Sequence, residues 1–208
     1  SGKTIAFGVP LVAMLAAAGN QPREARKPRA LVLAPTRELA EQIDRTLSQL
    51  AKSVGFFTTT IYGGAPQYRQ EQALKRGVDI IIATPGRLED LMAQGIVDLS
   101  EVETIVVDEA DHMCDLGFIE PVKRIMRACG DSQKLLFSAT LDRGVDTLVK
   151  QYLKSPKTHS LQNDRASVST MEHYILVMNP GDKDDITAQI AARNGKTILF
   201  VKTQRGAD

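Results

Sequence analysis

The chain of 208 residues lacks tryptophan and has few other aromatic residues and few cysteines. Aromatic residues make up only 5% of the chain, which argues against an aromatic platform for stacking nucleobases. Two cysteines, Cys114 and Cys129, are too few for a disulfide framework or a cysteine zinc cluster, so both are expected to be buried, reduced thiols. Such thiols are typical of a reducing compartment, and the sequence therefore predicts a cytoplasmic location.

Long hydrophobic runs and an excess charge of one sign are also lacking. No apolar stretch approaches the ~20 residues of a membrane-spanning helix and no signal peptide is visible, so no membrane partner is expected. Lys and Arg number 26 and Asp and Glu 25, a formal net charge of +1. This balance neither predicts nor excludes nucleic-acid binding, because a local basic strip or backbone amides can bind phosphate without a basic average.

Short apolar runs alternate with helical patterns as far as residue 160. The runs are rich in Val, Ile and Leu, as expected of buried parallel strands, and they cover residues 30–34, 58–62, 79–83, 104–107 and 134–137. Apolar periodicity, or a glycine or proline stop, predicts helices over residues 5–15, 39–54, 67–76, 86–94, 119–129 and 142–153. This alternation predicts an α/β domain with a doubly wound parallel sheet flanked by helices.

The pattern changes after about residue 160, where a polar stretch predicts a linker. The expected later elements are a strand over 174–178, a helix over 183–193 and a strand over 197–201. Because this tail is too short to close a core and the chain begins inside a motif, the sequence predicts a fragment. Its expected parts are a first domain over 1–160 without its first strand, a linker over 161–170, and the start of a truncated second α/β domain over 171–208.

The first four residues match the end of a phosphate-binding loop. Ser1-Gly2-Lys3-Thr4 fits the last positions of the pattern G-x-x-x-x-G-K-[ST], and a helical apolar stretch follows it. Small residues let backbone N–H groups approach phosphate oxygens, while the lysine reaches the outer phosphates and the hydroxyl reaches a magnesium ion. Taken alone, four residues without the upstream glycine indicate nucleotide binding only weakly.

A second acidic motif strengthens this interpretation. The apolar run over 104–107 leads directly into Asp108 and Glu109, followed by Asp111. The carboxyl end of a buried strand would place Asp108 at a magnesium ion and Glu109 where it can orient an attacking water. The alternative, a strand that ends in a solvated acidic turn, is disfavoured by the upstream loop pattern and the alternating strands.

The tetrad DEAD at residues 108–111 resembles the signature of the DEAD-box helicases, and other motifs of that family accompany it in the family's order. They are PTRELA at 35–40, GG at 63–64, TPGR at 84–87, D-x-GF at 115–118, SAT at 138–140 and LFVKT at 199–203. The resemblance spans essentially the whole chain. It implies a P-loop, RecA-like fold and an ATP-dependent RNA helicase, in which RNA-stimulated ATP hydrolysis drives local duplex unwinding or remodelling of RNA–protein complexes.

The resemblance also implies ATP and Mg²⁺ as cofactors, with a set of nucleotide-site residues. Those that would bind the nucleotide are Ser1, Gly2, Lys3, Thr4 and Asp108. Thr4 and, through water, Asp108 would hold the magnesium ion. The implied catalytic residues are Lys3, Asp108 and Glu109.

A third implied group would connect the nucleotide site to RNA. Asp111 would hydrogen-bond Ser138 or Thr140 and so couple the two sides of the domain. The bland alternative is that the two hydroxyls are satisfied locally at the end of a strand.

RNA is the implied partner, and its contacts would fall in loops that follow predicted strands. The residues concerned are Pro35, Thr36, Arg37, Gly63, Gly64, Thr84, Pro85, Gly86 and Arg87. Helix N-termini, glycine amides, Thr hydroxyls and Arg suit phosphate oxygens, so recognition would be sequence-independent. As alternatives, Arg37 would serve a structural ion pair, and Gly64 and Gly86 would be turn residues.

Two other functions stay open on the sequence alone, a DNA helicase or translocase of the same superfamily and a non-catalytic RNA-binding fragment. The set of motifs favours the RNA helicase. The family's adenine-reading segment and the arginine-bearing motif of its second domain are not in the 208 residues. Since an arginine finger contributes ~10³ or more in rate, the chain alone is expected to have negligible ATPase and no unwinding activity.

Overall fold

The computed structural model describes residues 2–19, 21–141, 143–160, 172 and 174–201. The chain divides into two compact units, Ser1–Thr158 and His159–Asp208. Among the described residues, no helix combines the length and the apolar character that crossing a membrane requires.

The first unit is built on a five-stranded parallel sheet, in which the strand order is β2-β3-β1-β4-β5. The strands are β1 Ala30–Leu33, β2 Thr58–Ile61, β3 Ile80–Ala83, β4 Thr104–Val107 and β5 Gln133–Leu136. The three central strands are buried along their whole length, which explains why their Val, Ile and Leu residues show no alternation. All five predicted strands and the predicted parallel α/β fold are confirmed.

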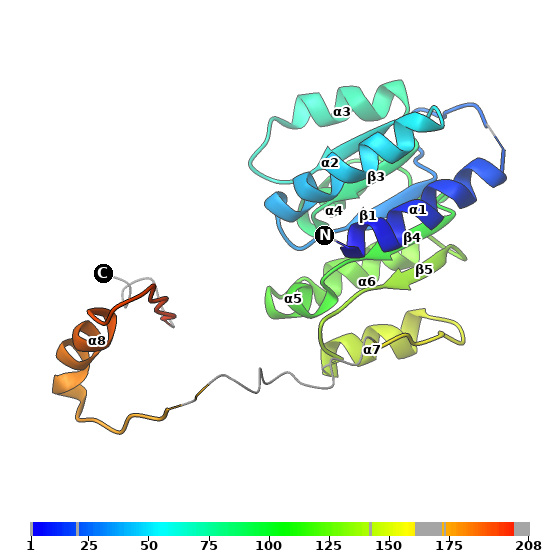
Figure 1. Cartoon of the computed structure of the whole chain (residues 1–208). Helices are drawn as coiled ribbons and strands as arrows, with labels where there is room; N and C mark the ends of the chain where they lie inside the picture. Colours follow the sequence, from blue (N-terminus) through cyan, green and yellow to red (C-terminus); the bar gives the residue numbers. More distant parts are fainter. Residues whose placement is uncertain (1, 20, 142, 161–171, 173, 202–208) are drawn as a thin grey trace. The chain divides into compact units, whose positions relative to one another are not determined.

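Helices cover both faces of the sheet (Figure 1). They are α1 Gly2–Ala17, α2 Arg37–Ser53, α3 Gln67–Arg76, α4 Pro85–Ala93, α5 Ala110–Asp115, α6 Ile119–Ala128 and α7 Arg143–Tyr152. The sequence predicted all of these except α5. A helix of six residues is too short to show an apolar period.

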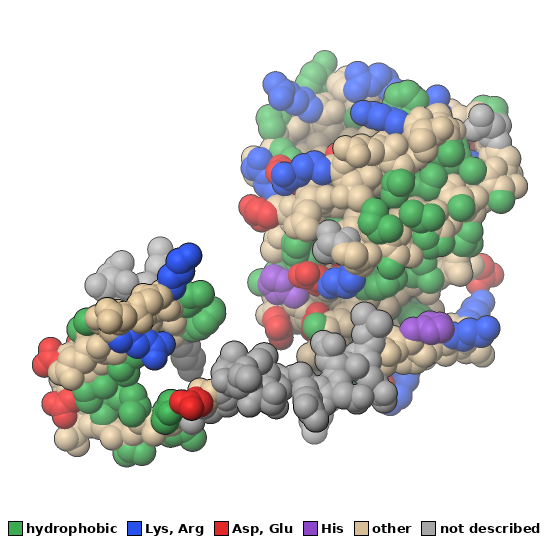
Figure 2. All heavy atoms as spheres, in the orientation of Figure 1, with side chains coloured by type: hydrophobic (Ala, Val, Ile, Leu, Met, Phe, Trp, Pro, Cys, Tyr) green, Lys and Arg blue, Asp and Glu red, His purple; other side chains and the backbone are tan. Residues whose placement is uncertain are grey.

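Alternating strand residues divide the core into two layers. Val32 and Ile82 point to the face covered by α1 and α2. Leu31 and Ile81 point to the opposite face, which α4, α5, α6 and α7 cover. The outer side of α1 remains apolar, and Figure 2 shows hydrophobic side chains gathered over this helix, where Ile5, Val9 and Met14 are each more than 40% exposed.

One prediction for this unit is confirmed only in part, and one buried charge was not predicted. Cys129 is buried, and burial raises the pKa of its thiol to about 12, but Cys114 is only half-buried. Arg29 is 7% exposed although it lies in a strongly basic stretch. Its guanidinium pairs with Glu103 (Nε to Oε1, 2.6 Å) and donates to the carbonyl of Leu15 at 3.1 Å, which satisfies the last turn of α1.

The second unit contains a short 3₁₀ turn, Pro180–Asp182, and α8, Lys183–Ala191. The predicted helix is therefore confirmed. The strands predicted over 174–178 and 197–201 are not formed, since the described residues there have no regular structure. A strand needs a hydrogen-bonded neighbour, and none lies within the described part of this unit. The predicted linker, residues 161–170, lies outside the described residues.

Candidate functional site

The sequence motifs meet at the carboxyl edge of the sheet. Because the strands are parallel and in register, with Leu33 beside both Ala83 and Val107, their last residues end at the same level. The neighbours β1 and β4 then continue into helices on opposite faces, α2 and α5. Open α/β sheets usually bind their ligands at such a reversal, beyond the carboxyl ends of the strands.

At this edge of the sheet, the N-terminus of α1 meets the end of β4. The Nζ atom of Lys3 lies 3.7 Å from Oδ1 of Asp108 and 3.8 Å from Oε1 of Glu109. Thr4 and Asp108 are 2% and 6% exposed, respectively. The fold thus brings together residues that the sequence places far apart and that its pattern assigned to one site.

Asp108 is an unusual carboxylate because it is buried. Burial raises its pKa, and this effect outweighs the opposing influence of Lys3 and of the Glu109 N–H, which donates to Oδ1 at 3.0 Å. A buried carboxylate with one distant ammonium group is under-compensated, so a cation beside it is favoured.

The donor set at Asp108 fits magnesium. Within the described residues, no group of three or more His, Cys, Asp or Glu side chains could hold a metal by itself. A single carboxylate is the sparse kind of oxygen donor that Mg²⁺ accepts, since it keeps several waters and takes the remaining ligands from substrate phosphates.

Glu109 has a strained backbone. Its φ and ψ are 51° and 53°, the left-handed region, which costs a non-glycine residue ~1 kcal/mol or more. This conformation turns the chain from β4 into α5 and leaves the carboxylate 3.5 Å (Oε2) from Nδ1 of His112. No role was predicted for His112 from the sequence. The available signal was its spacing, three residues after Glu109 on a helix.

Asp111 connects the end of β4 to the loop after β5. Its Oδ2 accepts hydrogen bonds from the backbone N–H of Thr140 at 3.0 Å and from the Thr140 hydroxyl at 3.1 Å. Its own N–H donates to the Ser138 hydroxyl at 3.2 Å. Burial acts to raise the pKa of Asp111, but the bonds from the His112 N–H and from Thr140 outweigh it and lower the pKa. Asp111 is therefore an ionised acceptor that ties the two loops together.

The residues implied in RNA contact after β1 are already engaged. The Thr36 hydroxyl accepts from the N–H of Leu39 at 3.3 Å and caps α2. The Arg37 Nε donates to Glu41 at 2.9 Å, and its guanidinium lies over the Tyr62 ring, 5.1 Å from the centroid. In this chain Arg37 thus has the structural ion pair that was the alternative for it.

The two glycines differ in what requires them. Gly64 has a φ of +77°, so its turn conformation favours glycine. Gly86 lies in the first turn of α4 without a positive φ, and a Cβ there would meet nothing within 4 Å. No turn geometry therefore requires a glycine at position 86, and its lack of a side chain leaves the surface there open.

The start of α4 is open in a second respect. Thr84 is its N-cap residue and makes no side-chain capping bond, and Pro85 follows. The first N–H groups of α4 therefore lack a side-chain acceptor at this edge. Arg87 donates through Nη1 to the carbonyl of Ala65 at 3.4 Å, which holds α4 beside the turn that contains Gly63 and Gly64.

Comparison with known proteins gives one consistent result. A model of the DEAD/DEAH box helicase family matches residues 1–148. All of the chain aligns with the DEAD-box ATP-dependent RNA helicase 3A, chloroplastic, of Zea mays at 39% identity, covering 29% of that protein. It also aligns in full with DEAD-box ATP-dependent RNA helicase 9, mitochondrial, of Arabidopsis thaliana at 36% identity, covering 35% of it. The chain thus spans about a third of the length of these relatives.

Solved structures agree. The RNA-helicase Prp28 from Chaetomium thermophilum bound to ADP is similar over 74% of this chain and 37% of its own, with a TM-score of 0.67 and 38% identity. A DEAD box protein from Methanococcus jannaschii is similar over 93% of this chain and 50% of its own, with a TM-score of 0.69 and 31% identity. The predicted RecA-like, P-loop fold is therefore confirmed.

The predicted cytoplasmic location is wrong as an inference from this sequence. Similar proteins carry chloroplastic and mitochondrial names, and a third, 32% identical over the whole chain, is Nucleolar RNA helicase 2 of Rattus norvegicus. Reduced cysteines report on redox conditions and not on a compartment. A sequence core that proteins of several compartments share does not determine where a protein is located.

Proposed function

Because this chain belongs to the DEAD/DEAH box helicase family, we propose that its parent protein is an ATP-dependent RNA helicase. It couples ATP hydrolysis to local unwinding of RNA duplexes or to remodelling of RNA–protein complexes. The observation that carries this proposal is one acidic turn with contacts on both sides, since Asp108 pairs with Lys3 and Asp111, three residues later, bonds Ser138 and Thr140. Such a turn lets the occupancy of one site alter loop geometry at another.

ATP would bind across the N-terminus of α1. The free N–H groups and dipole of this helix, together with the Lys3 ammonium, suit the outer phosphates, and Gly2 allows their close approach. Thr4 and, through water, Asp108 would hold Mg²⁺, which neutralises phosphate charge when bound. Ser1, the other residue proposed for this loop, lies outside the described residues.

Glu109 is the proposed acceptor for the attacking water. Its carboxylate lies beside Lys3 and His112, and its side chain is 31% exposed and therefore within reach of solvent. Its strained backbone fixes the carboxylate relative to Asp108 on the same turn. Lys3 would withdraw toward the phosphates on nucleotide binding, which frees Glu109 to orient water.

RNA would bind the loops after β1, β2 and β3 through its backbone. The proposed contacts are Pro35, Thr36, Arg37, Gly63, Gly64, Thr84, Pro85, Gly86 and Arg87. Helix N-termini and glycine amides supply N–H donors for phosphate without reading bases. Since Arg37 and Arg87 are held by Glu41 and Ala65 in the free chain, RNA would have to replace these contacts. A preference for RNA over DNA would rest on contacts to the 2′-OH.

We also propose that residues 1–160 form most of the first motor domain and residues 171–208 begin the second, joined by 161–170. A compact unit that ends at Thr158 supports the first boundary. A site completed by a second motor domain would leave the chain alone without measurable turnover.

The test is RNA-stimulated ATPase of the full-length parent. Glu109→Gln should lower turnover by at least ~100-fold, in the range typical of a lost general base, while ATP binding persists. Glu101→Gln removes an exposed carboxylate that lies before the start of β4, and this matched control should leave turnover unchanged. Equal activation by single-stranded DNA and RNA would favour the translocase alternative, and ATPase retained by Glu109→Gln would overturn the proposed role of Glu109.

A further inference from the structure

One outer edge of the sheet is formed by β2. Among the described residues, β2 is a terminal strand whose one partner is β3. The N–H of Ile80 donates to the carbonyl of Phe57, and that of Thr84 to the carbonyl of Ile61, so alternate residues of β2 turn toward β3. The N–H and C=O groups of Thr58 and Thr60 therefore face the open edge.

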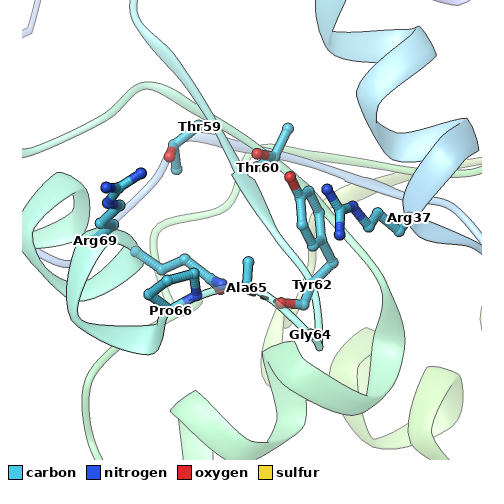
Figure 3. A pocket seen from close by; sticks show the side chains of 9 residues that line it. Arg37, Thr59, Thr60, Tyr62, Gly64, Ala65, Pro66 and Arg69 are labelled. Carbon is cyan, nitrogen blue, oxygen red and sulfur yellow. Dashed lines mark hydrogen bonds between the residues drawn. The ribbon is translucent and has the colours of Figure 1, made fainter.

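Natural proteins usually guard such an edge with a lysine, a proline, a bulge or a covering segment. The β2 sequence is Thr-Thr-Thr-Ile, which has high β propensity and none of the guarding residues. Two adjoining hollows lie along it and share Thr59 in their lining. In Figure 3, Thr59 and Thr60 lie between Arg69 on one side and Tyr62 with Arg37 on the other.

The two hollows together form a groove along β2, and one wall of this groove is basic. Arg69, Ala73 and Arg76 of α3 line the two hollows at helical spacings of four and three residues, so they form one stripe ~10 Å long. Figure 2 shows Lys and Arg side chains gathered over this end of the first unit, where α3 lies in Figure 1. Arg23 lies at the far end of the groove, stacked 4.2 Å from the Phe57 ring centroid.

The charge of the groove has one sign. The residues that line the two hollows include four arginines and no aspartate or glutamate. Arg23 and Arg37 are neutralised by Asp79 and Glu41. The side chains of Arg69 and Arg76 are exposed and have no ion-pair partner in the part of the chain that the structure describes. They are two cations beside a row of unpaired backbone groups.

We propose that the edge of β2 binds an extended acidic segment of a partner protein, which adds a strand to the sheet. Backbone bonds to Thr58 and Thr60 would supply affinity that does not depend on sequence, as in other strand additions. Carboxylates on one face of the added strand recur every ~7 Å, and they would meet Arg69 and Arg76. The exposed Phe57 ring offers an apolar contact at the end of the groove.

The backbone groups of β2, which form the floor of the groove, favour a peptide over RNA. Regularly spaced backbone donors and acceptors complement another peptide strand, whereas RNA phosphates use donors only. The Thr58 hydroxyl already donates to Asp44 at 2.6 Å, so it is not available to donate to a phosphate.

The direct test is fluorescence anisotropy of the chain with a labelled peptide in which Glu alternates with Val and Thr. The peptide should bind, and a Glu-to-Gln version should bind roughly tenfold more weakly, as expected when two charged contacts are lost. Arg69→Glu and Arg76→Glu should each weaken binding several-fold. Lys52→Glu makes the same charge change on an exposed helix position outside the groove and should leave binding unchanged.

Strand addition has a separate readout. Thr60→Pro removes an N–H that faces the open edge and no ladder bond, so the variant should keep its melting temperature and lose peptide binding. Hydrogen exchange tests strand addition without any substitution, because a bound peptide should slow exchange at the Thr60 amide of the unmodified chain.

Three results would overturn the proposal. The first is a peptide that binds Arg69→Glu and Arg76→Glu as tightly as the unmodified chain and does not slow hydrogen exchange at the Thr60 amide. The second is an oligouridine RNA that occupies the groove in place of the peptide and is weakened equally by Arg76→Glu, which would make the groove part of the RNA path. The third is edge-to-edge pairing of two copies of the chain. It would appear as a dimer in sedimentation that is lost in Thr60→Pro, together with an absence of peptide binding.

Discussion

Asp108→Asn should make the fold more stable while it disables the proposed nucleotide site. The folded protein buries the Asp108 carboxylate, and burial raises its pKa. Above the ordinary carboxyl pKa of about 4, the unfolded chain loses this proton more readily than the folded chain does. The burial penalty therefore grows as pH rises through the folded pKa and is fully present at neutral pH.

The size of the effect follows from what asparagine keeps and what it removes. The amide oxygen can still accept from the Glu109 N–H, which lies 3.0 Å from Oδ1, and the volume hardly changes. Lys3 loses a partner 3.7 Å away, but its side chain is 43% exposed and stays hydrated, so that loss is small. We expect a gain of about 1 kcal/mol at pH 7, or about 2–4 °C in Tm for a domain of this size.

Thermal melts of the chain at pH 7 and near pH 4.5 provide the assay, with Glu101→Gln as the control for loss of an exposed carboxylate. The gain from Asp108→Asn should shrink as pH falls toward the raised pKa of the carboxyl group, because the group that it replaces is then increasingly protonated. A variant that melts lower at pH 7, or one whose gain is the same at both pH values, would refute the reasoning.

Two further changes test other parts of the site. Asp111→Asn should cost about 1 kcal/mol at neutral pH, because two bonds from Thr140 lose their charged acceptor. Since the pKa of Asp111 is lowered by folding, this loss should fade in melts as pH falls through that pKa, and RNA stimulation of the parent ATPase should fall more than basal turnover. Gly86→Leu fills open space at the start of α4, so it should leave Tm unchanged or higher and weaken RNA binding at least ~10-fold in a filter or anisotropy assay. A Gly86→Leu parent with normal RNA affinity would remove α4 from the proposed RNA face.

The sequence was sufficient where a local pattern determines structure. Buried parallel strands are uniformly apolar, so the runs at β1, β3 and β4 could be recognised without knowing their neighbours. Parallel topology then places the ends of these strands at one edge, which is why the lysine of the loop pattern and the carboxylates after β4 could be assigned to one site.

The sequence was insufficient where a partner decides the outcome. The strands predicted over 174–178 and 197–201 had suitable residues but have no neighbouring strand among the described residues. Burial of Arg29 depends on Glu103 and the end of α1, neither of which is local to it. The left-handed turn at Glu109 likewise depends on bonds that α5 makes to the loop after β5.

The level ends of the strands fix how much of a nucleic acid this unit can touch. The loops proposed for RNA follow β2, β3 and β1, which are adjacent in the sheet. Two strand spacings of ~4.8 Å make this contact ~10 Å wide, or about three nucleotides at ~3.4 Å each. With ~0.7 counterions released per phosphate, the logarithm of the binding constant should fall with that of salt at a slope of only about −2. A contact with so few nucleotides would let this unit dissociate readily from RNA.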